Sequence, residues 1–252
     1  MGQVLVTGAR RGIGKAIALA FAAADFDVAV ADLELTTELQ DVAEKIRSRG
    51  VKSVAIAIDI ADISAHHAAL DLAEKAIGPL TTLINNAGVS VMNRGDLLDV
   101  TPESFDRCIG VNTRGTFFLT QAFAKRVRET VTICHRSIIT ITSANATAAS
   151  IARGEYCVSK AGASMGSKLF ASRLSDEDIG VYEIQPGFIE TDMTAPSKAK
   201  YDALIEGGLT VIKRFGSPQE VAKIAVTLAS GLLPYTSGQV IHADGGLLTV
   251  RY

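Results

Sequence analysis

The chain has 252 residues, of which 48% are hydrophobic and 21% charged, a composition typical of a soluble globular protein. Its formal net charge of −2 gives no electrostatic reason to expect binding to nucleic acid or to an anionic membrane surface. No apolar run reaches the roughly 18 residues that a membrane-spanning helix needs, so we expect neither nucleic acid nor a membrane among its partners.

Short apolar runs rich in β-branched residues alternate with longer helical patterns along the whole chain. The expected strands span residues 3–7, 27–31, 53–59, 82–85, 137–142, 181–185 and 240–243. Their nearly continuous apolar character is typical of strands that are buried on both faces. The expected helices span residues 13–24, 37–48, 63–77, 102–128, 156–174 and 218–229.

The alternation of strand and helix predicts a parallel sheet with right-handed crossovers and helices on both faces. We therefore predict an α/β fold in three layers, doubly wound around a seven-stranded parallel sheet. No linker, repeat or low-complexity tract divides the chain, so we predict one domain over residues 1–252. The polar segment 188–213, with Pro196 inside it, breaks the rhythm and is expected to be a substrate lid.

The stretch "TGARRGIG", residues 7–14, joins the first expected strand to the first expected helix. Its glycines would let the backbone turn tightly and approach a pyrophosphate at the helix N-terminus, as in a Rossmann fold, although many glycine-rich turns are only turns. It lacks the Lys-Ser/Thr ending of a P-loop, which disfavours a nucleoside triphosphate. We predict a dinucleotide here, contacted by Gly8, Arg10, Arg11, Gly12, Ile13 and Gly14.

Asp32 follows the second expected strand, about 20 residues after the glycines, where a carboxylate accepts hydrogen bonds from the adenosine ribose. It would also repel a 2′-phosphate, whereas Arg10 or Arg11 could pair with one. Near a surface, opposite charges about 4 Å apart interact by about 4 kcal/mol, so one arginine could offset the aspartate. We predict NAD, with NADP as the alternative, because a strand-end carboxylate is held in place. A plain helix-capping role for Asp32 is the competing interpretation.

The stretch "RGEYCVSKAG", residues 153–162, places Tyr156 and Lys160 one helical turn apart. Removing hydride from an alcohol carbon requires a base for the hydroxyl proton, and the ordinary tyrosine pKa of about 10 is too high. The lysine ammonium and an oxidised nicotinamide would lower it. We predict Tyr156 as the general acid/base; an exposed i,i+4 pair is the alternative.

Further polar residues follow other expected strands, at the sheet edge where ligands of open α/β folds gather. Ser143 ends the fifth strand and is expected to hold the substrate oxygen, unless it only terminates the strand. The "NNAG" stretch closes the fourth strand, and Asn86, Ala87 and Gly88 are expected to line the cofactor. From their adjacency to these motifs, the expected substrate contacts are Asn145, Glu155 and Phe188.

The motifs resemble those of the short-chain dehydrogenase/reductase family, in its single-domain form, over essentially the whole chain. They are "TGARRGIG", "NNAG" at 85–88, Asn112, Ser143, "YCVSK" at 156–160 and "PG" at 186–187. The resemblance, which extends to members labelled 3-oxoacyl-acyl-carrier-protein reductase, implies that Lys160 also binds the nicotinamide ribose and that Asn112 holds a relay water. It further implies a homotetramer and cofactor contacts from Asp59, Ile60, Pro186, Gly187, Ile189 and Thr191.

The predicted function is hydride transfer between a nicotinamide cofactor and a secondary alcohol or ketone. Polar residues such as Asn93 and Arg94 near the expected pocket favour a polyol, sugar or small hydroxy compound as substrate. A 3-oxoacyl-acyl-carrier-protein reductase is the alternative. Such an enzyme normally uses NADPH and binds an acidic carrier, which Asp32 and the mildly acidic chain fit poorly. Four basic residues near the expected lid could still contact an acidic carrier: Lys198, Lys200, Lys213 and Arg214. A catalytically silent, cofactor-binding regulator is the alternative from another class.

The cysteines and histidines show no metal-ligand spacing, so we predict no metal. Cys108, Cys134 and Cys157 cannot all pair and suggest reduced thiols. The N-terminus lacks the layout of a signal peptide. Together these features predict a cytoplasmic protein.

Overall fold

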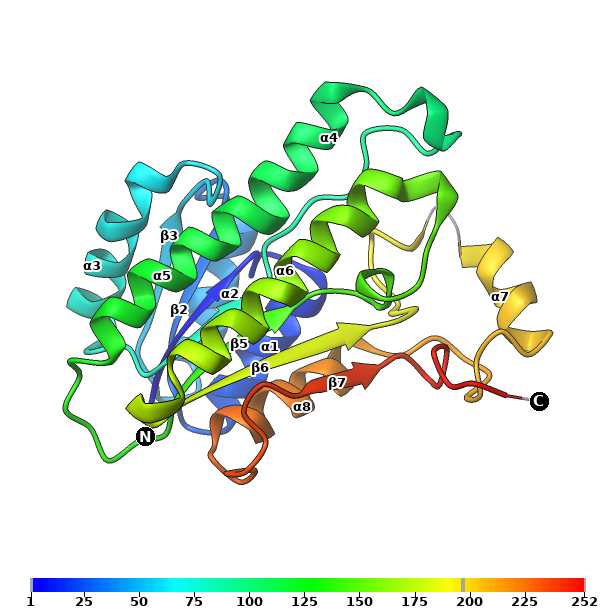
Figure 1. Cartoon of the computed structure of the whole chain (residues 1–252). Coiled ribbons are helices and arrows are strands. Elements are labelled where there is room, and N and C mark those ends of the chain that lie inside the picture. Colours follow the sequence, from blue (N-terminus) through cyan, green and yellow to red (C-terminus); the bar gives the residue numbers. More distant parts are fainter. Residues whose placement is uncertain (1, 196–197, 252) are drawn as a thin grey trace.

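The computed structural model describes residues 2–195 and 198–251. Its sheet has seven strands, all paired in parallel, in the order β3-β2-β1-β4-β5-β6-β7 (Figure 1). The predicted α/β fold is confirmed. The strands are β1 Gln3–Thr7, β2 Asp27–Asp32, β3 Ser53–Ala57, β4 Thr82–Asn85, β5 Arg136–Ile141, β6 Ile179–Pro186 and β7 Val240–Ala243.

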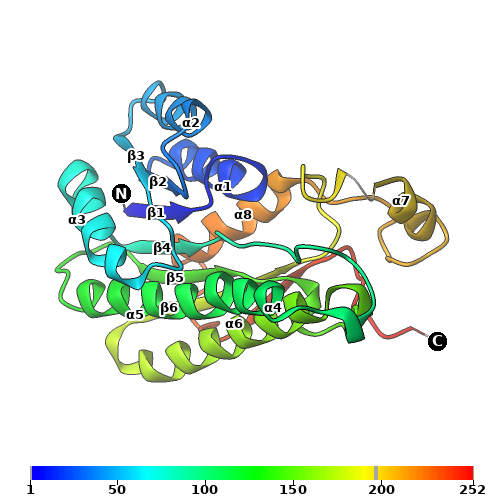
Figure 2. The same ribbon diagram turned by 90° about the horizontal axis from the view of Figure 1, so that it is seen from above.

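Helices cover both faces of the sheet and complete the three layers. The helices are α1 Gly12–Ala23, α2 Thr37–Arg47, α3 His66–Ile77, α4 Pro102–Cys108, α5 Thr116–Val127, α6 Gly154–Arg173, α7 Lys198–Glu206 and α8 Pro218–Ala229. Figure 2 shows α1, α2 and α8 on one side of the sheet and α3, α5 and α6 on the other.

The hydrophobic core is split by the sheet because successive side chains of a strand point to opposite faces. In β1, Val4 and Val6 belong to the cluster beneath α1, α2 and α8, whereas Leu5 belongs to the cluster beneath α3 and α5. All three side chains are fully buried. Burial on both faces explains why these strands are apolar throughout rather than at alternate positions.

The prediction of one continuous helix over 102–128 is wrong, because the middle of this range is not α-helical. α4 and α5 are separated by a π-helical segment, Ile109–Gly115. Gly115 packs so closely on the backbone of Ile60 that an added Cβ would lie 2.4 Å from its carbonyl oxygen. Such wide turns are rare and concentrate at functional sites, and this one carries Asn112.

Two further differences from the prediction concern β3 and the segment 188–213. β3 ends at Ala57 rather than at residue 59, because the Asp59 carboxylate accepts the backbone N–H of Ala61 and turns the chain. The polar segment 188–213 contains the unpredicted helix α7, where Lys198 and Asp202 form an ion pair at 3.0 Å. The expected break at Pro196 lies outside the described residues.

The sheet topology creates a site at the carboxyl ends of its strands. The strand order reverses between β1 and β4, and open α/β sheets bind ligands at such a switch point. In the part of the chain that the structure describes, no helix is both long and apolar enough to cross a membrane.

Candidate active site

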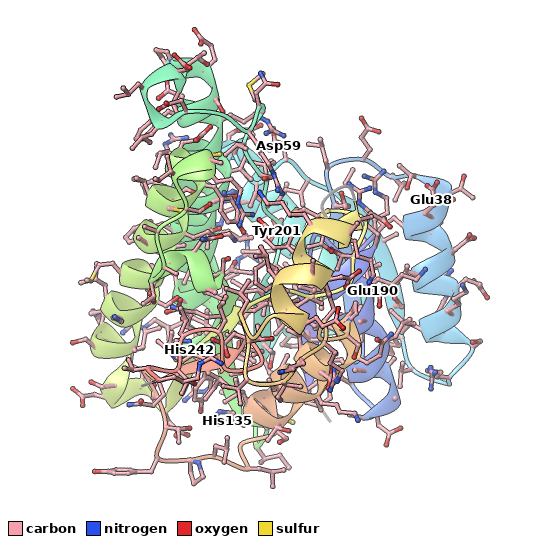
Figure 3. The ribbon with its side chains drawn as sticks, turned by 90° about the vertical axis from the view of Figure 1, so that its right-hand side faces the viewer. Glu38, Asp59, His135, Glu190, Tyr201 and His242 are labelled. Carbon is pink, nitrogen blue, oxygen red and sulfur yellow. The ribbon has the colours of Figure 1, made fainter. Side chains whose placement is uncertain are left out.

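One cavity of about 1000 Å³ extends along the carboxyl edge of the sheet. It begins at the glycine-rich turn between β1 and α1 and reaches the start of α6 and the segment after β6. Asp59 and Tyr201, both labelled in Figure 3, are among its lining residues. Every predicted site residue lines this cavity except Asn112 and Glu155.

The glycine-rich turn has no room for side chains. A Cβ on Gly14 would lie 2.1 Å from the carbonyl oxygen of Gly8, and Gly8 itself has a φ of +64°. Asn86, from the end of β4, holds the turn by donating to the carbonyls of Thr7 at 2.9 Å and Gly8 at 3.0 Å. The turn is therefore a rigid concavity at a helix N-terminus, the arrangement that receives phosphate groups in proteins.

The Asp32 carboxylate is held by two backbone N–H groups, from Arg10 at 3.1 Å and from Leu33 at 2.9 Å. It faces the cavity and does not cap a helix, since the N-cap of α2 is Thr36. Arg11 lies 3.7 Å from Asp192 in the segment after β6, and both side chains are largely exposed. The carboxylate is thus fixed in place, while one of the two arginines is directed toward the predicted lid.

Tyr156 and Lys160 are buried on the cavity side of α6. The Lys160 ammonium lies 5.8 Å from the centre of the Tyr156 ring and donates to the Ile141 carbonyl at 3.1 Å. Burial lowers the pKa of Lys160 to about 8, and the charge of Glu183 opposes this shift.

Within the protein alone, the surroundings of Tyr156 raise its pKa. Burial of the phenol raises the pKa, and the hydrogen bond with Ser143 and the charge of Arg153 act in the opposite direction. Within the protein, Ser143 and Arg153 therefore favour the phenolate, which the sequence prediction had assigned to Lys160 and the cofactor.

Asn112 lies beside the cavity rather than in its wall. Its amide donates to the Val89 carbonyl and to the Ser159 hydroxyl, both at 2.9 Å, and accepts the Val89 N–H at 2.8 Å. A Cβ on Gly88 would lie 3.0 Å from the Asn112 amide oxygen and 3.3 Å from the Lys160 ammonium. The missing side chain of Gly88 thus leaves room next to both groups.

A family model described as enoyl-(acyl carrier protein) reductase matches residues 8–248, from the glycine-rich turn to beyond β7. The chain belongs to the short-chain dehydrogenase/reductase family. It is an oxidoreductase of the ketoreductase type, and members of this family bind NAD(P).

Relatives within the family carry different names. The 3-oxoacyl-[acyl-carrier-protein] reductase of Staphylococcus aureus is 34% identical over 247 residues, 97% of each chain. The crystal structure of a 3-oxoacyl-[acyl-carrier protein] reductase from Brucella melitensis in complex with NAD is 42% identical, with a TM-score of 0.96 over 100% of this chain and 98% of that one. The crystal structure of a putative 2-deoxy-D-gluconate 3-dehydrogenase from Agrobacterium tumefaciens with bound NADP is 30% identical, with a TM-score of 0.86 over 99% of this chain and 97% of that one.

Two predicted substrate residues of this short-chain dehydrogenase/reductase line the cavity and the third does not. Asn145 and Phe188 lie in its wall, and the Phe188 ring packs 4.4 Å from that of Tyr201. The Glu155 carboxylate is buried away from the cavity and accepts the Ser104 hydroxyl at 2.6 Å. The prediction for Glu155 is not supported, because adjacent helical residues point about 100° apart.

The sequence analysis missed Arg153. Its guanidinium lies 5.2 Å from the centre of the Tyr156 ring, lines the cavity and donates to the amide oxygen of Asn145. Its position three residues before Tyr156 gave no clear signal, because Arg153 precedes α6 and its backbone is not helical (φ −149°, ψ 43°).

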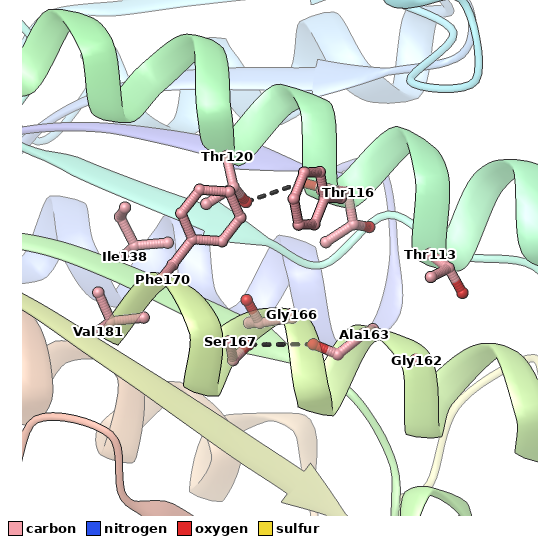
Figure 4. A pocket seen from close by; sticks show the side chains of 12 residues that line it. Thr113, Thr116, Thr120, Ile138, Gly162, Ala163, Gly166, Ser167, Phe170 and Val181 are labelled. Carbon is pink, nitrogen blue, oxygen red and sulfur yellow. Dashed lines mark hydrogen bonds between the residues drawn. The ribbon is translucent and has the colours of Figure 1, made fainter. Parts of the chain in front are cut away.

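A much smaller cavity, of about 10 Å³, lies between α5 and α6, where Ile138 and Val181 of the sheet also line it (Figure 4). Its wall includes Phe117, Phe170 and Gly166, and hydrogen bonds from Thr120 to Thr116 and from Ser167 to Ala163 stay within each helix. It is too small for any substrate and is a packing space between the two helices.

Proposed function

We propose that this enzyme transfers hydride between NAD and the carbinol carbon of a secondary alcohol or ketone, with Tyr156 as general acid/base. One observation carries the proposal: a single cavity is lined by the glycine-rich turn and Asp32 and also by Ser143, Tyr156 and Lys160. When bound, the nicotinamide supplies the hydride acceptor or donor.

The cavity wall is suited to a dinucleotide. The concavity at Gly8 and Gly14, which a Cβ would fill, suits the pyrophosphate, and the fixed Asp32 carboxylate suits the ribose hydroxyls. Lys160 would donate to the nicotinamide ribose. The remaining cofactor contacts that we propose are Arg10, Arg11, Gly12, Ile13, Asp59, Ile60, Asn86, Ala87, Gly88, Pro186, Gly187, Ile189 and Thr191.

The acid/base step belongs to the groups at the start of α6. Ser143 and Tyr156 would hold the substrate oxygen between two hydroxyls. In oxidation the Tyr156 phenolate takes the hydroxyl proton, and in reduction the phenol returns one to the carbonyl oxygen. Ser143 and Arg153 favour the phenolate, Lys160 lies buried beside the ring, and Asn112 would hold a water that connects Lys160 to solvent.

NAD is proposed over NADP because the Asp32 carboxylate is held by two backbone N–H groups and would repel a 2′-phosphate. The relative from Brucella melitensis was crystallised with NAD, and the one from Agrobacterium tumefaciens with NADP. Because the two relatives differ in their cofactor, the proposal of NAD rests on Asp32.

The substrate proposed here is a polyol, sugar or small hydroxy compound. The names of several relatives favour the alternative, reduction of a 3-oxoacyl group on an acyl carrier protein. Lys198 and Lys200 on α7, within the proposed lid 188–213, offer positive charge to an acidic carrier. The alternative from another class is a regulatory protein that binds the cofactor and does not catalyse a reaction.

We also propose a cytosolic homotetramer, built on the exposed side of α6. Val158, Met165 and Leu169 follow one another at helical spacing there and are each more than half exposed. The three cysteines are free thiols, as in a reducing compartment.

A paired activity screen tests the function. Polyols, sugars, hydroxy acids and 3-hydroxyacyl thioesters are each incubated with NAD and with NADP, and nicotinamide absorbance is followed. Turnover with NAD and a small secondary alcohol is expected. Turnover of the thioesters alone would favour the acyl-carrier alternative, and tight cofactor binding without turnover the regulator.

A further inference from the structure

The guanidinium of Arg153 stands beside the reacting groups. Arg153 closes the short 3₁₀ turn Ile151–Arg153 directly before α6, and its side chain lies over the Tyr156 ring, with 5.2 Å between Cζ and the ring centre. It is half-buried, and it lines the same cavity as Tyr156 and Ser143.

Hydrogen bonds through Asn145 hold the Arg153 guanidinium in place and connect it to Ser143. Arg153 donates to the amide oxygen of Asn145, whose own amide N–H₂ donates to the Ala148 carbonyl at 3.0 Å. The backbone N–H of Asn145 donates to the Ser143 hydroxyl at 3.1 Å. Ser143, Asn145 and Arg153 thus form one hydrogen-bonded unit, and it places the positive charge close to the hydroxyl that receives the substrate oxygen.

The charge of this guanidinium is not balanced by the protein. Over residues 2–195 and 198–251, no acidic side chain lies within the 4.0 Å of Arg153 that would make an ion pair. Glu155, two residues away, is committed to Ser104. Among these residues, the Arg153 side chain makes one hydrogen bond, to the neutral amide of Asn145. A half-buried arginine of this kind is stabilised by an anion that accepts its remaining N–H groups.

We propose that Arg153 binds a carboxylate of the substrate, so that the enzyme acts on a hydroxy acid whose carboxylate lies within a few bonds of the carbinol. The proposal rests on the proposed function. In oxidation the carbinol O–H proton passes to the Tyr156 phenolate and the C–H bond breaks as hydride to the oxidised nicotinamide, which leaves an oxo acid with its carboxylate still on Arg153.

The charge distinguishes this substrate from an acyl thioester. A thioester presents a neutral carbonyl where a hydroxy acid presents a carboxylate, so it gives Arg153 no counter-charge. Planar guanidinium and carboxylate groups form paired hydrogen bonds, which also fix the direction of the substrate in the cavity.

The test compares acids with their neutral isosteres. A short series of 2-, 3- and 4-hydroxycarboxylates and the corresponding primary amides is assayed with NAD. For the best acid of the wild type, Arg153→Met is expected to raise KM and to lower kcat/KM roughly 10- to 100-fold more than for the amide. Loss of the Arg153 charge beside Tyr156 lowers kcat for acid and amide alike, so the rise in KM for the acid is the specific readout. Arg153→Lys is expected to retain part of the kcat/KM for the acid that Arg153→Met loses. Asn145→Asp is expected to weaken binding of the acid, because the new carboxylate pairs with Arg153.

Arg107→Gln is the matched control. Arg107 also lines the cavity, but its side chain is exposed and donates to the Ser90 carbonyl, so the acid-to-amide ratio is expected to stay as in the wild type. Binding of the acid to the protein with NADH, followed by calorimetry, gives a second measure that needs no turnover. It should weaken in Arg153→Met and not in Arg107→Gln.

The outcomes separate the two proposals. Turnover of neutral alcohols with no preference for acids, or an equal loss of kcat/KM for acid and amide in Arg153→Met with KM for the acid unchanged, would overturn the carboxylate site and leave the proposed function standing. No turnover of any alcohol in the series or in the wider screen would contradict the proposed function, and the carboxylate site with it.

Discussion

Tyr156 shows how a buried residue departs from what its neighbours in the sequence predict. One helical turn separates it from Lys160, yet the ammonium lies 5.8 Å from the ring centre and donates to the Ile141 carbonyl. Burial then raises the pKa of the phenol, and Ser143 and Arg153 oppose the shift. Sequence spacing predicted the pair, but the sign of the shift depends on desolvation, which does not follow from an i,i+4 pattern.

Lys160 makes stability depend on pH. Burial lowers its pKa from 10.5 to about 8, so between these values the folded protein binds fewer protons than the unfolded chain. Stability therefore rises with pH across this window. The free energy of urea unfolding, wild type minus Lys160→Met, is expected to rise by up to about 3 kcal/mol from pH 8 to 10.5. A flat or falling difference would show that the ammonium is not desolvated.

Asp32 is expected to set the cofactor preference. Asp32→Ala removes the charge that repels a 2′-phosphate, so the ratio of kcat/KM for NAD to that for NADP should fall by at least about tenfold. Glu34→Ala, which removes an exposed carboxylate outside the cavity wall, is the control and should leave the ratio unchanged. An unchanged ratio in Asp32→Ala would indicate that Arg10 or Arg11 decides the preference.

At the scale of elements, the turn between β1 and α1 depends on the absence of a side chain. In Gly14→Ala the new Cβ meets the Gly8 carbonyl, so we expect a loss of about 1–3 kcal/mol in stability together with weaker NAD binding. Gly95→Ala is the control, since a Cβ there has no neighbour within 4 Å. Thermal unfolding and cofactor titration measure both effects. Unimpaired NAD binding in Gly14→Ala would contradict the proposed pyrophosphate site.

The strands were predictable because burial on both faces imposes continuous apolar runs. β1, β4 and β7 match the prediction at both ends. The π segment was not predictable, because it depends on the fit of Gly115 against Ile60, a contact between distant parts of the chain. The helix α7 lies in a polar segment without an apolar periodicity, and it buries one large side chain, Ile205.

The site was predictable where motifs mark strand ends, and less so on the helix that follows. Glu155 and Arg153 show the limit: the helical phase of α6 turns Glu155 to Ser104, whereas Arg153 precedes the helix and reaches the cavity. A helix beginning at Gly154 rather than at residue 156 fixes that phase. Charge and polarity alone favoured the wrong one of the two.

For the whole molecule, α6 serves two faces. One lines the cavity with Tyr156 and Lys160, and the other exposes 51% of Val158, 54% of Met165 and 56% of Leu169. We propose that this apolar stripe lies in an interface between subunits. The proposed homotetramer would bury this stripe and so hold the catalytic helix in place.

The assembly is testable by mass. Sedimentation equilibrium is expected to give about four times the 26.5 kDa of one chain. Leu169→Glu should shift the protein toward smaller species, because it places a charge in the apolar stripe. Leu72→Glu, an exposed position on α3, is the control. A monomer in the wild type at micromolar concentration would contradict the tetramer.

We propose that one cavity joins a dinucleotide site to a tyrosine acid/base. The most direct measurement is substrate-dependent NADH formation in wild type and Tyr156→Phe, with NAD affinity determined on the same samples. Loss of the phenol proton is expected to lower turnover by about 100- to 10,000-fold and to leave NAD binding nearly unchanged. Turnover near the wild-type rate in Tyr156→Phe, or a wild type that does not bind NAD(P), would contradict it.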